Sequence, residues 1–173
     1  TQEYYDKICQ LALDNNFTMA THAIGDSANR LMLNTYGKFL KGKNDKRWRI
    51  EHAQIVNQAD FEKFAEFSIV PSVQATHCTS DMFWAENRVG AERAQGAYAY
   101  QTLLGQNGWL PNGTDFPVEN IEPLFTFFAS VFRTDHNGNP ASGWHIDDGL
   151  TREQALRSMT ICSAISNRLA NRQ

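Results

Sequence analysis

Apolar residues recur along this chain at two spacings, one typical of amphipathic helices and one typical of short strands. Tyr4, Ile8 and Leu11 stand three or four positions apart, which predicts a helix over residues 2–15. The same spacing returns in later segments, the last of which follows a capping-box signal that starts at Thr151. The predicted helices cover residues 2–15, about 28–39, about 57–67, 92–105, 122–132 and the stretch after residue 151.

Short segments rich in β-forming residues lie between the predicted helices. Successive segments are far enough apart for one helix each, so the strands should run parallel and the fold class should be α/β. No Gly-x-Gly-x-x-Gly fingerprint of an open dinucleotide-binding sheet follows any of them. Strands are predicted over residues 17–22, 47–52, 69–74 and 109–115, with a polar stretch between the third strand and residue 92.

The length of the chain limits how this topology can close. An open doubly wound sheet and a (β/α)8 barrel both place their chemistry at the carboxyl ends of parallel strands. A complete barrel needs at least about 200 residues, and four strands in 173 residues amount to half of one. We therefore expect a single unit over residues 1–173 that is either an open sheet or part of a barrel.

Composition excludes several classes of function. Apolar residues make up 42% and charged residues 20%, as in ordinary globular proteins. A net charge of −3 argues against a nucleic-acid partner, and no run approaches the roughly 20 apolar residues of a membrane span. Three widely spaced cysteines argue against a disulfide framework. The missing signal segment does not decide the compartment, because the chain opens inside a helical pattern; the cytoplasm is favoured and export stays open.

Three of the four predicted strands end in a residue that can bind a divalent metal ion. These residues are His22, His52 and Asp115. Adjacent parallel strands lie about 4.8 Å apart. Imidazoles at two neighbouring strand ends can therefore reach one ion at about 2.0–2.1 Å. The sequence predicts a metal site at the carboxyl end of the sheet.

Side-chain alternation predicts which face of the sheet carries these groups. It places His52 on the same face as Ile50, with His22 on the matching face of its own strand. Arg49 and Glu51 then lie on the opposite face beneath the helices, where we expect them to form an ion pair. Plainer alternatives stay open at this point. A lone strand-end histidine is more often a hydrogen-bonded structural residue, and an aspartate before Phe-Pro can simply cap a turn.

Four segments of sequence connect these residues to a known family. They occur in order and begin at Thr21 (THAIGDSA), Arg49 (RIEHAQ), Pro71 (PSVQATHCTSDM) and Asn112 (NGTDFPVE). Together they resemble the amidohydrolase superfamily, specifically amidohydrolase family 3, the YtcJ-like branch that includes N-substituted formamide deformylases. The segment from Leu150 (LTREQALRSMTICSAISN) is similar to that family's helix after the eighth strand. The resemblance covers nearly the whole chain and implies strands five to eight of a (β/α)8 barrel.

The resemblance implies a role for each matching residue. His22 and His52 match metal ligands that end the family's fifth and sixth strands, and Asp115 matches the eighth-strand aspartate that binds metal and shuttles a proton. The implied cofactor is a divalent metal, zinc in the first place, as one or two ions. The implied reaction is hydrolysis of a carbon–nitrogen, amide-like bond of a small molecule by a metal-activated water. The implied substrate-binding residues, with the last two in a loop that overhangs the pocket, are His77, Asp81 and Trp84.

Two family features are absent from the sequence. The family's first strand carries an H-x-H pair of ligands, and no H-x-H occurs here. The lysine or acidic ligand of the family's fourth strand would precede the first strand predicted here. We therefore expect an incomplete portion of the enzyme that does little or no hydrolysis alone. Unpaired sheet edges and an exposed inner face should make it self-associate.

Two other functional classes stay open from the sequence. Cys78 beside His77 suggests a thiol nucleophile, although a buried, inert cysteine is the commoner case. The chain can also be a non-catalytic α/β binding or assembly module in which the strand-end residues bind nothing. A stoichiometric metal ion that is lost on His52→Ala would separate the hydrolase from this module.

Overall fold

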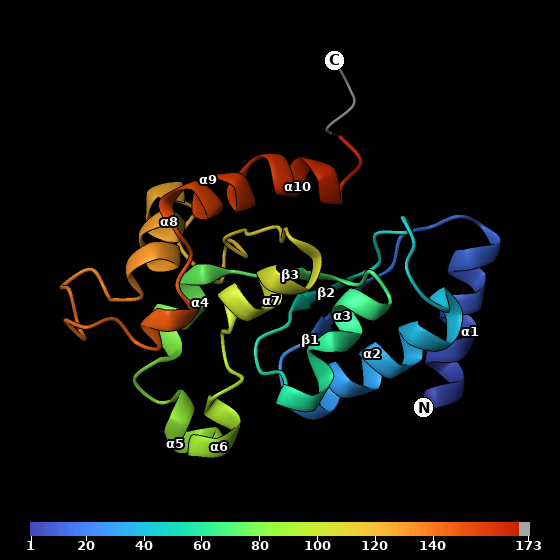
Figure 1. Ribbon diagram of the computed structural model, residues 1–173, viewed down its shortest axis with the longest axis horizontal. Coiled ribbons are helices and arrows are strands. Elements are labelled where there is room, and N and C mark those ends of the chain that lie inside the picture. The colour runs from blue at the N-terminus through green and yellow to red at the C-terminus, as the bar shows by residue number, and fades with distance from the viewer. Residues whose placement is uncertain (170–173) are drawn as a thin grey trace.

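Parallel strands form the centre of the molecule, as the sequence predicts. The computed structural model describes residues 1–169, and its three-stranded parallel sheet has the order β1-β2-β3 with helices around it (Figure 1). The elements are α1 (Gln2–Asp14), β1 (Ala20–Ala23), α2 (Asp26–Leu40), β2 (Arg49–His52), η1 (Gln58–Asp60), α3 (Glu62–Glu66), β3 (Val70–Ser72), α4 (Ala75–Asp81), α5 (Ala85–Val89), α6 (Ala91–Ala94), α7 (Tyr100–Asn107), α8 (Pro123–Phe132), η2 (Ile146–Asp148), α9 (Arg152–Met159) and α10 (Ile161–Ser166).

The fourth predicted strand is reduced to a single parallel bridge between Val73 and Asn112. The Val73 N–H donates to the Pro111 carbonyl over 3.0 Å, and the Gly113 N–H donates to the Val73 carbonyl over 2.9 Å. Pro111 has no N–H to donate, which limits how far a ladder can extend. The bridged segment nevertheless continues the order of the sheet beyond β3. The carboxyl ends of all four segments therefore lie on the same side.

The two faces of the sheet have different environments. Trp48 and Ile50 are fully buried in the core that includes α2. On the other face, Arg49 pairs with Glu51 and its Nη1 donates to Ser166 Oγ of α10 over 3.4 Å. The predicted ion pair is confirmed, but the face that packs beneath α2 carries Ile50, and not Arg49 and Glu51 as predicted. Figure 1 shows α9 and α10 running across this second side of the sheet, away from α1, α2 and α3.

The predicted helix over residues 92–105 is wrong, because two short helices with a pairing segment between them take its place. The Val56 N–H donates to the Gly96 carbonyl over 2.9 Å, and the Tyr98 N–H donates to the Gln54 carbonyl over 2.7 Å. A side chain at Gly96 would collide with the Val56 carbonyl, so this approach requires glycine. Long-range backbone pairing therefore overrides the local helical pattern between α6 and α7.

The C-terminal part of the chain follows the predicted capping signal. Thr151 and Gln154 form the expected reciprocal capping box at the start of α9. The helix is interrupted at Thr160, where α9 ends and α10 begins. Among residues 1–169, no helix combines the length and the apolar character that crossing a bilayer requires.

Candidate metal centre

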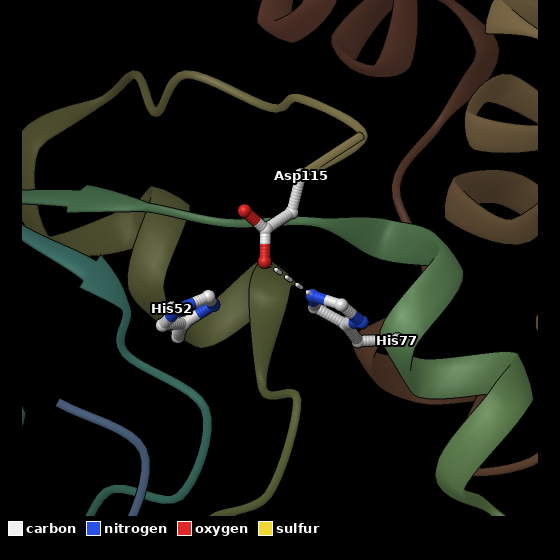
Figure 2. Close-up of side chains that lie close together, drawn as sticks. All are labelled: His52, His77 and Asp115. Atoms are coloured by element: carbon white, nitrogen blue, oxygen red, sulfur yellow. Dashed lines mark ion pairs between the residues drawn. The ribbon is translucent and has the colours of Figure 1, made fainter. Parts of the chain in front are cut away.

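One side chain from each of three segments reaches a common space beyond the carboxyl end of the sheet. His52 ends β2, His77 lies on α4, and Asp115 follows the bridged segment. One nitrogen or carboxylate oxygen from each residue lies within 4.8 Å of the other two (Figure 2). His52 is 8% exposed, and the side chains of His77 and Asp115 are 12% and 34% exposed. The two imidazoles are thus sheltered, while the carboxylate stays accessible.

A turn in the backbone at His52 brings its ring to this space. His22 pairs with Glu51 in the parallel register, so regular alternation would send the two histidines to opposite faces. The φ angles of His52 and Ala53 are 77° and 44°, in the left-handed region, where histidine is one of the more tolerated residues. The ring centroids of His22 and His52 consequently lie 4.9 Å apart. The predicted sharing of a face with Ile50 is wrong, although the rings do converge.

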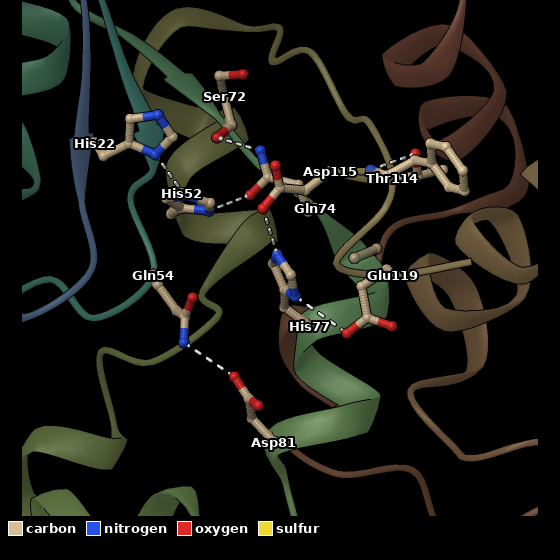
Figure 3. A network of polar contacts seen from close by, with 12 residues as sticks. His22, His52, Gln54, Ser72, Gln74, His77, Asp81, Thr114, Asp115 and Glu119 are labelled. Atoms are coloured by element: carbon tan, nitrogen blue, oxygen red, sulfur yellow. Dashed lines mark hydrogen bonds and ion pairs between the residues drawn. The ribbon is translucent and has the colours of Figure 1, made fainter. Parts of the chain in front are cut away.

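A neighbouring amide fixes the proton on the His52 ring. His52 Nδ1 lies 2.7 Å from Gln74 Oε1. Gln74 Nε2 donates to the Ser72 carbonyl over 3.4 Å, which orients the amide so that its oxygen accepts from His52. In the neutral ring, His52 Nε2 then carries no proton, and it lies 2.8 Å from His22 Nδ1. Both ring nitrogens of His52 thus lie at hydrogen-bond distance from a neighbour, Nδ1 from Gln74 and Nε2 from His22 (Figure 3).

His77 approaches the same space from a helix. Asn112 Oδ1 accepts from the Ala75 N–H over 3.1 Å, so the bridged segment satisfies a backbone donor in the first turn of α4. His77 Nε2 lies 3.4 Å from Asp115 Oδ2, and Nδ1 lies 3.1 Å from Glu119 Oε1 (Figure 3). Both ring nitrogens of His77 therefore face carboxylates of the segment that follows the bridged residue Asn112.

The sequence places Asp81 and Trp84 in a common loop over the pocket, and this expectation is wrong. Asp81 is the last residue of α4, and Trp84 is the N-cap of α5 with 48% of its surface exposed. Asp81 Oδ2 accepts from Gln54 Nε2 over 3.0 Å and from the Tyr98 hydroxyl over 2.5 Å. Burial, and then the Asp81 carboxylate, raise the pKa of Tyr98, so the hydroxyl remains a donor. Asp81 thus anchors α4 to neighbouring segments.

The thiol alternative loses its support from the position of Cys78. Its side chain is fully buried. Burial raises the pKa of the Cys78 thiol to about 11. The reactive thiolate is consequently scarce at neutral pH.

Gln74 and Glu119 are the contacts that sequence reasoning missed. Each stands at a place that the sequence marks. Gln74 ends the third predicted strand, and Glu119 closes the fourth family-like segment. Neither is a distinctive metal ligand by type, so only their distances to the histidines reveal them. Gln54 and Tyr98, which hold Asp81, carry no such signal because their pairing depends on chain segments far apart in sequence.

The donor set fits a divalent metal ion. Two imidazole nitrogens and one carboxylate are ligands that catalytic zinc sites use, with a further position left open. Ligands about 2.0–2.2 Å from a tetrahedral ion stand about 3.3–3.5 Å apart, and His77 Nε2 and Asp115 Oδ2 are 3.4 Å apart. His22 falls outside the compact set among the described residues but contacts it through His52.

Fold and site together define an α/β protein with a metal-type cluster at the carboxyl end of a parallel sheet. A sequence profile of the amidohydrolase family matches residues 1–172. The chain therefore belongs to the amidohydrolase family, and the resemblance carried by its motifs is confirmed.

Curated relatives of the chain are much longer proteins. It is 35% identical over 162 residues to Protein LONG AFTER FAR-RED 3 of Arabidopsis thaliana, covering 87% of this chain and 27% of that protein. It is 28% identical over 162 residues to the putative amidohydrolase YtcJ of Bacillus subtilis (strain 168), covering 94% of this chain and 30% of that protein. The chain thus spans less than a third of either relative.

Solved structures share the fold over almost the whole chain. An uncharacterized metal-dependent hydrolase from Pyrococcus horikoshii OT3 superposes with a TM-score of 0.84 at 28% identity, covering 98% of this chain and 34% of the other. An uncharacterized metal-dependent hydrolase from Pyrococcus furiosus gives a TM-score of 0.82 at 29% identity, covering 99% of this chain and 33% of the other.

Proposed function

We propose that this chain forms part of a metal-dependent hydrolase that cleaves carbon–nitrogen, amide-like bonds of small molecules. The observation that carries the proposal is the convergence of His52, His77 and Asp115 within 4.8 Å. Family membership supports hydrolysis, and the donor set supports a divalent ion, with zinc as the first candidate. A polar cavity of about 270 Å³ lined by residues that include Gln74 and Asp115 provides room beside the cluster.

The residues of the chain have distinct parts in the proposed reaction. A divalent ion bound by His52, His77 and Asp115, with His22 beside them, would supply a water that ionises near neutral pH. Asp115 accepts the proton of the attacking water and returns it to the departing nitrogen, which would otherwise leave as an unstable amide anion. Gln74 fixes the orientation of the His52 ring through its contact with Nδ1. The outcome is an amide-like bond cleaved by water, with one proton relayed by one carboxylate.

We also propose that the four strand segments are strands five to eight of a (β/α)8 barrel. Their consecutive parallel order, with carboxyl ends at the site, supports this arrangement. The hydrolase structures that share the fold are about three times as long as the matched region. Ligands from the remaining strands would complete the site, so the isolated chain is expected to turn over substrate poorly.

Metal analysis tests the proposed function. After dialysis against zinc, the wild-type chain should retain about one ion per chain by inductively coupled plasma mass spectrometry, and His52→Ala should lose it. His136→Ala is the matched control, because His136 is exposed in the loop after α8. Retention of metal by the control and its loss in His52→Ala support the hydrolase site. No bound zinc, manganese or nickel in the wild type would favour the non-catalytic module.

Self-association is a separate proposal that follows from exposed apolar groups. β1 lies at the edge of the sheet, and Phe17 just before it is 69% exposed. Val118 and Leu124, which follow the bridged segment at the other edge of the sheet, are 71% and 70% exposed. Light scattering should give the mass of a dimer or a larger oligomer, and Val118→Lys with Leu124→Lys should lower it. A monomeric mass for the wild type at high concentration would refute the proposal.

A further inference from the structure

Glu119 is the one partly buried side chain in an otherwise exposed stretch. In the described segment 116–124, every other residue is exposed. The neighbouring Val118 is 71% exposed, whereas the Glu119 side chain is 18% exposed. A carboxylate in a loop normally stays in water. The inward direction of this one therefore calls for a partner that compensates for its lost hydration.

The partner is the His77 ring. Glu119 Oε1 lies 3.1 Å from His77 Nδ1, and Figure 3 shows the carboxylate on the side of the ring away from Asp115. An ionised carboxylate only accepts hydrogen bonds, so His77 Nδ1 must carry the proton of this contact. In the neutral ring, Nε2 is then bare and lies 3.4 Å from Asp115 Oδ2. That separation is longer than the usual 2.7–2.9 Å of a charge-assisted hydrogen bond.

We propose that Glu119 is a positioning residue that holds His77 in the Nδ1–H tautomer, with Nε2 directed into the cluster. The part of this inference that concerns metal rests on the proposed function, whereas the tautomer does not. Histidines that bind metal generally donate their second ring nitrogen to such an acceptor. A ring without that acceptor can turn or carry its proton on Nε2, which blocks the ligand lone pair.

His52 provides an internal comparison, because Gln74 holds its Nδ1 in the same sense. Nδ1 is thus the held nitrogen in both rings, by a neutral amide in His52 and by a carboxylate in His77. Charge-assisted hydrogen bonds are roughly twice as strong as neutral ones. The carboxylate thus serves the histidine that stands on a short helix, while the amide serves the one at the end of a strand.

Nitrogen NMR on histidine-labelled chain without metal tests the tautomer. Long-range proton–nitrogen correlations, recorded at the alkaline end of the ring titration, distinguish a protonated Nδ1 from a protonated Nε2. His77 should be Nδ1–H in the wild type and mainly Nε2–H in Glu119→Ala. Glu119→Gln should restore Nδ1–H, because its side-chain oxygen can still accept. His52 should be unchanged in both variants, and Val118→Ala, at the exposed neighbour, should leave both rings as in the wild type.

The test of the His77 tautomer and the test of the proposed function can fail independently. A wild-type His77 with Nε2–H, or an unchanged His77 tautomer in Glu119→Ala, would overturn the inference. A zinc titration then measures the consequence for binding, for which loss of an outer-shell partner costs roughly 10–100-fold in affinity. If the wild type binds no zinc while the tautomer shifts as expected, the proposed metal site fails and the orienting role of Glu119 stands. If zinc affinity is equal in Glu119→Ala and the wild type, its role toward metal is refuted.

Discussion

The two sides of the site are built in different ways. On the strand side, His22 and His52 belong to neighbouring strands whose parallel register is fixed by backbone hydrogen bonds. On the helix–loop side, His77 stands on a helix of seven residues, and Asp115 lies in irregular chain with φ of 57°. The strand side is therefore held by a backbone ladder. The helix–loop side is held by side-chain hydrogen bonds.

The contrast identifies the hydrogen bonds on which the geometry of the cluster depends. Asn112 Oδ1 accepts from the Ala75 N–H, and Gln54 Nε2 donates to Asp81 Oδ2. These contacts tie α4 to segments that follow the sheet. An ion bound by His52, His77 and Asp115 would take ligands from both sides of the site. The hydrogen bonds that hold α4 therefore decide how far the site is preorganised. We expect the helix–loop side to adjust on binding and the strand side to keep its place.

The largest expected effect concerns Asp115, the proposed proton-carrying group of the helix–loop side. Asp115→Asn keeps the size of the side chain but removes its basic oxygen. In a protein that carries the complete proposed barrel, kcat on an amide-like substrate should fall by roughly 10²- to 10⁴-fold, the usual range for a general acid–base group. Asp14→Asn, at an exposed end of α1, is the control. A kcat within threefold of wild type would remove Asp115 from the proton relay.

The next largest effect tests whether His77 or His22 supplies the second imidazole ligand of the proposed metal site. His77 belongs to the compact cluster and His22 only adjoins it. His77→Ala should weaken zinc binding by more than the roughly 10–100-fold of an outer-shell loss, whereas His22→Ala should stay within that range. Competition titration with a chromophoric chelator measures both. A larger loss for His22→Ala would instead support the ligand set implied by family resemblance and would reverse the comparison between the two sides.

The strand side was largely predictable from the sequence, because local rules govern it. β-forming runs and helix-length intervals predict parallel strands, and strand ends predict the place of His22 and His52. The face of His52 was not predictable. Alternation assumes extended backbone, and the positive φ at His52 breaks that assumption. The convergence was expected, but the turn that produces it is visible only in the structure.

The helix–loop side was harder to predict, because long-range contacts decide it. Apolar residues at positions 75, 78, 82, 85 and 89 stand at helical spacing and signal α4 and α5, which the expectation of a polar stretch overlooked. Asn112 of a distant segment caps the first of these helices. The pairing of Gly96 with Val56 likewise divides the helix expected over residues 92–105. Motif resemblance named His77 as a substrate-pocket residue, which stays a prediction, and its contact with Glu119 is visible only in the structure.

A smaller effect tests the hydrogen bonds by which Tyr98 and Gln54 hold Asp81, the last residue of α4. The Tyr98 hydroxyl donates to Asp81 and accepts from Gln54 Nε2 over 2.6 Å. Tyr98→Phe leaves these buried partners short of a hydrogen bond and should lower the free energy of unfolding by about 1–3 kcal/mol. Urea denaturation measures this, with Tyr4→Phe, at a 61% exposed position, as a control expected to stay within about 0.5 kcal/mol.

Where Tyr98→Phe destabilises the protein is more informative than the size of the change in the free energy of unfolding. Hydrogen exchange in Tyr98→Phe should accelerate in α4 more than in β2, because the hydroxyl ties down the end of the helix. Equal acceleration in both elements would mean that the two sides unfold as one unit, and the proposed division between a ladder-held and a side-chain-held half would be wrong.

The smallest effect tests whether every polar group on the strand side matters to the site. Glu51 pairs with Arg49 on the face that carries His22, and their side chains are 19% and 23% exposed. Glu51→Gln keeps the shape of the side chain and should lower the free energy of unfolding by about 1 kcal/mol or less, as for partly solvated ion pairs. Its zinc affinity should equal that of the wild type, because Glu51 lies outside the cluster of His52, His77 and Asp115. A fall in affinity comparable to that of His77→Ala would make Glu51 a participant in the site, and the strand side would then contribute more than its backbone ladder and two imidazoles.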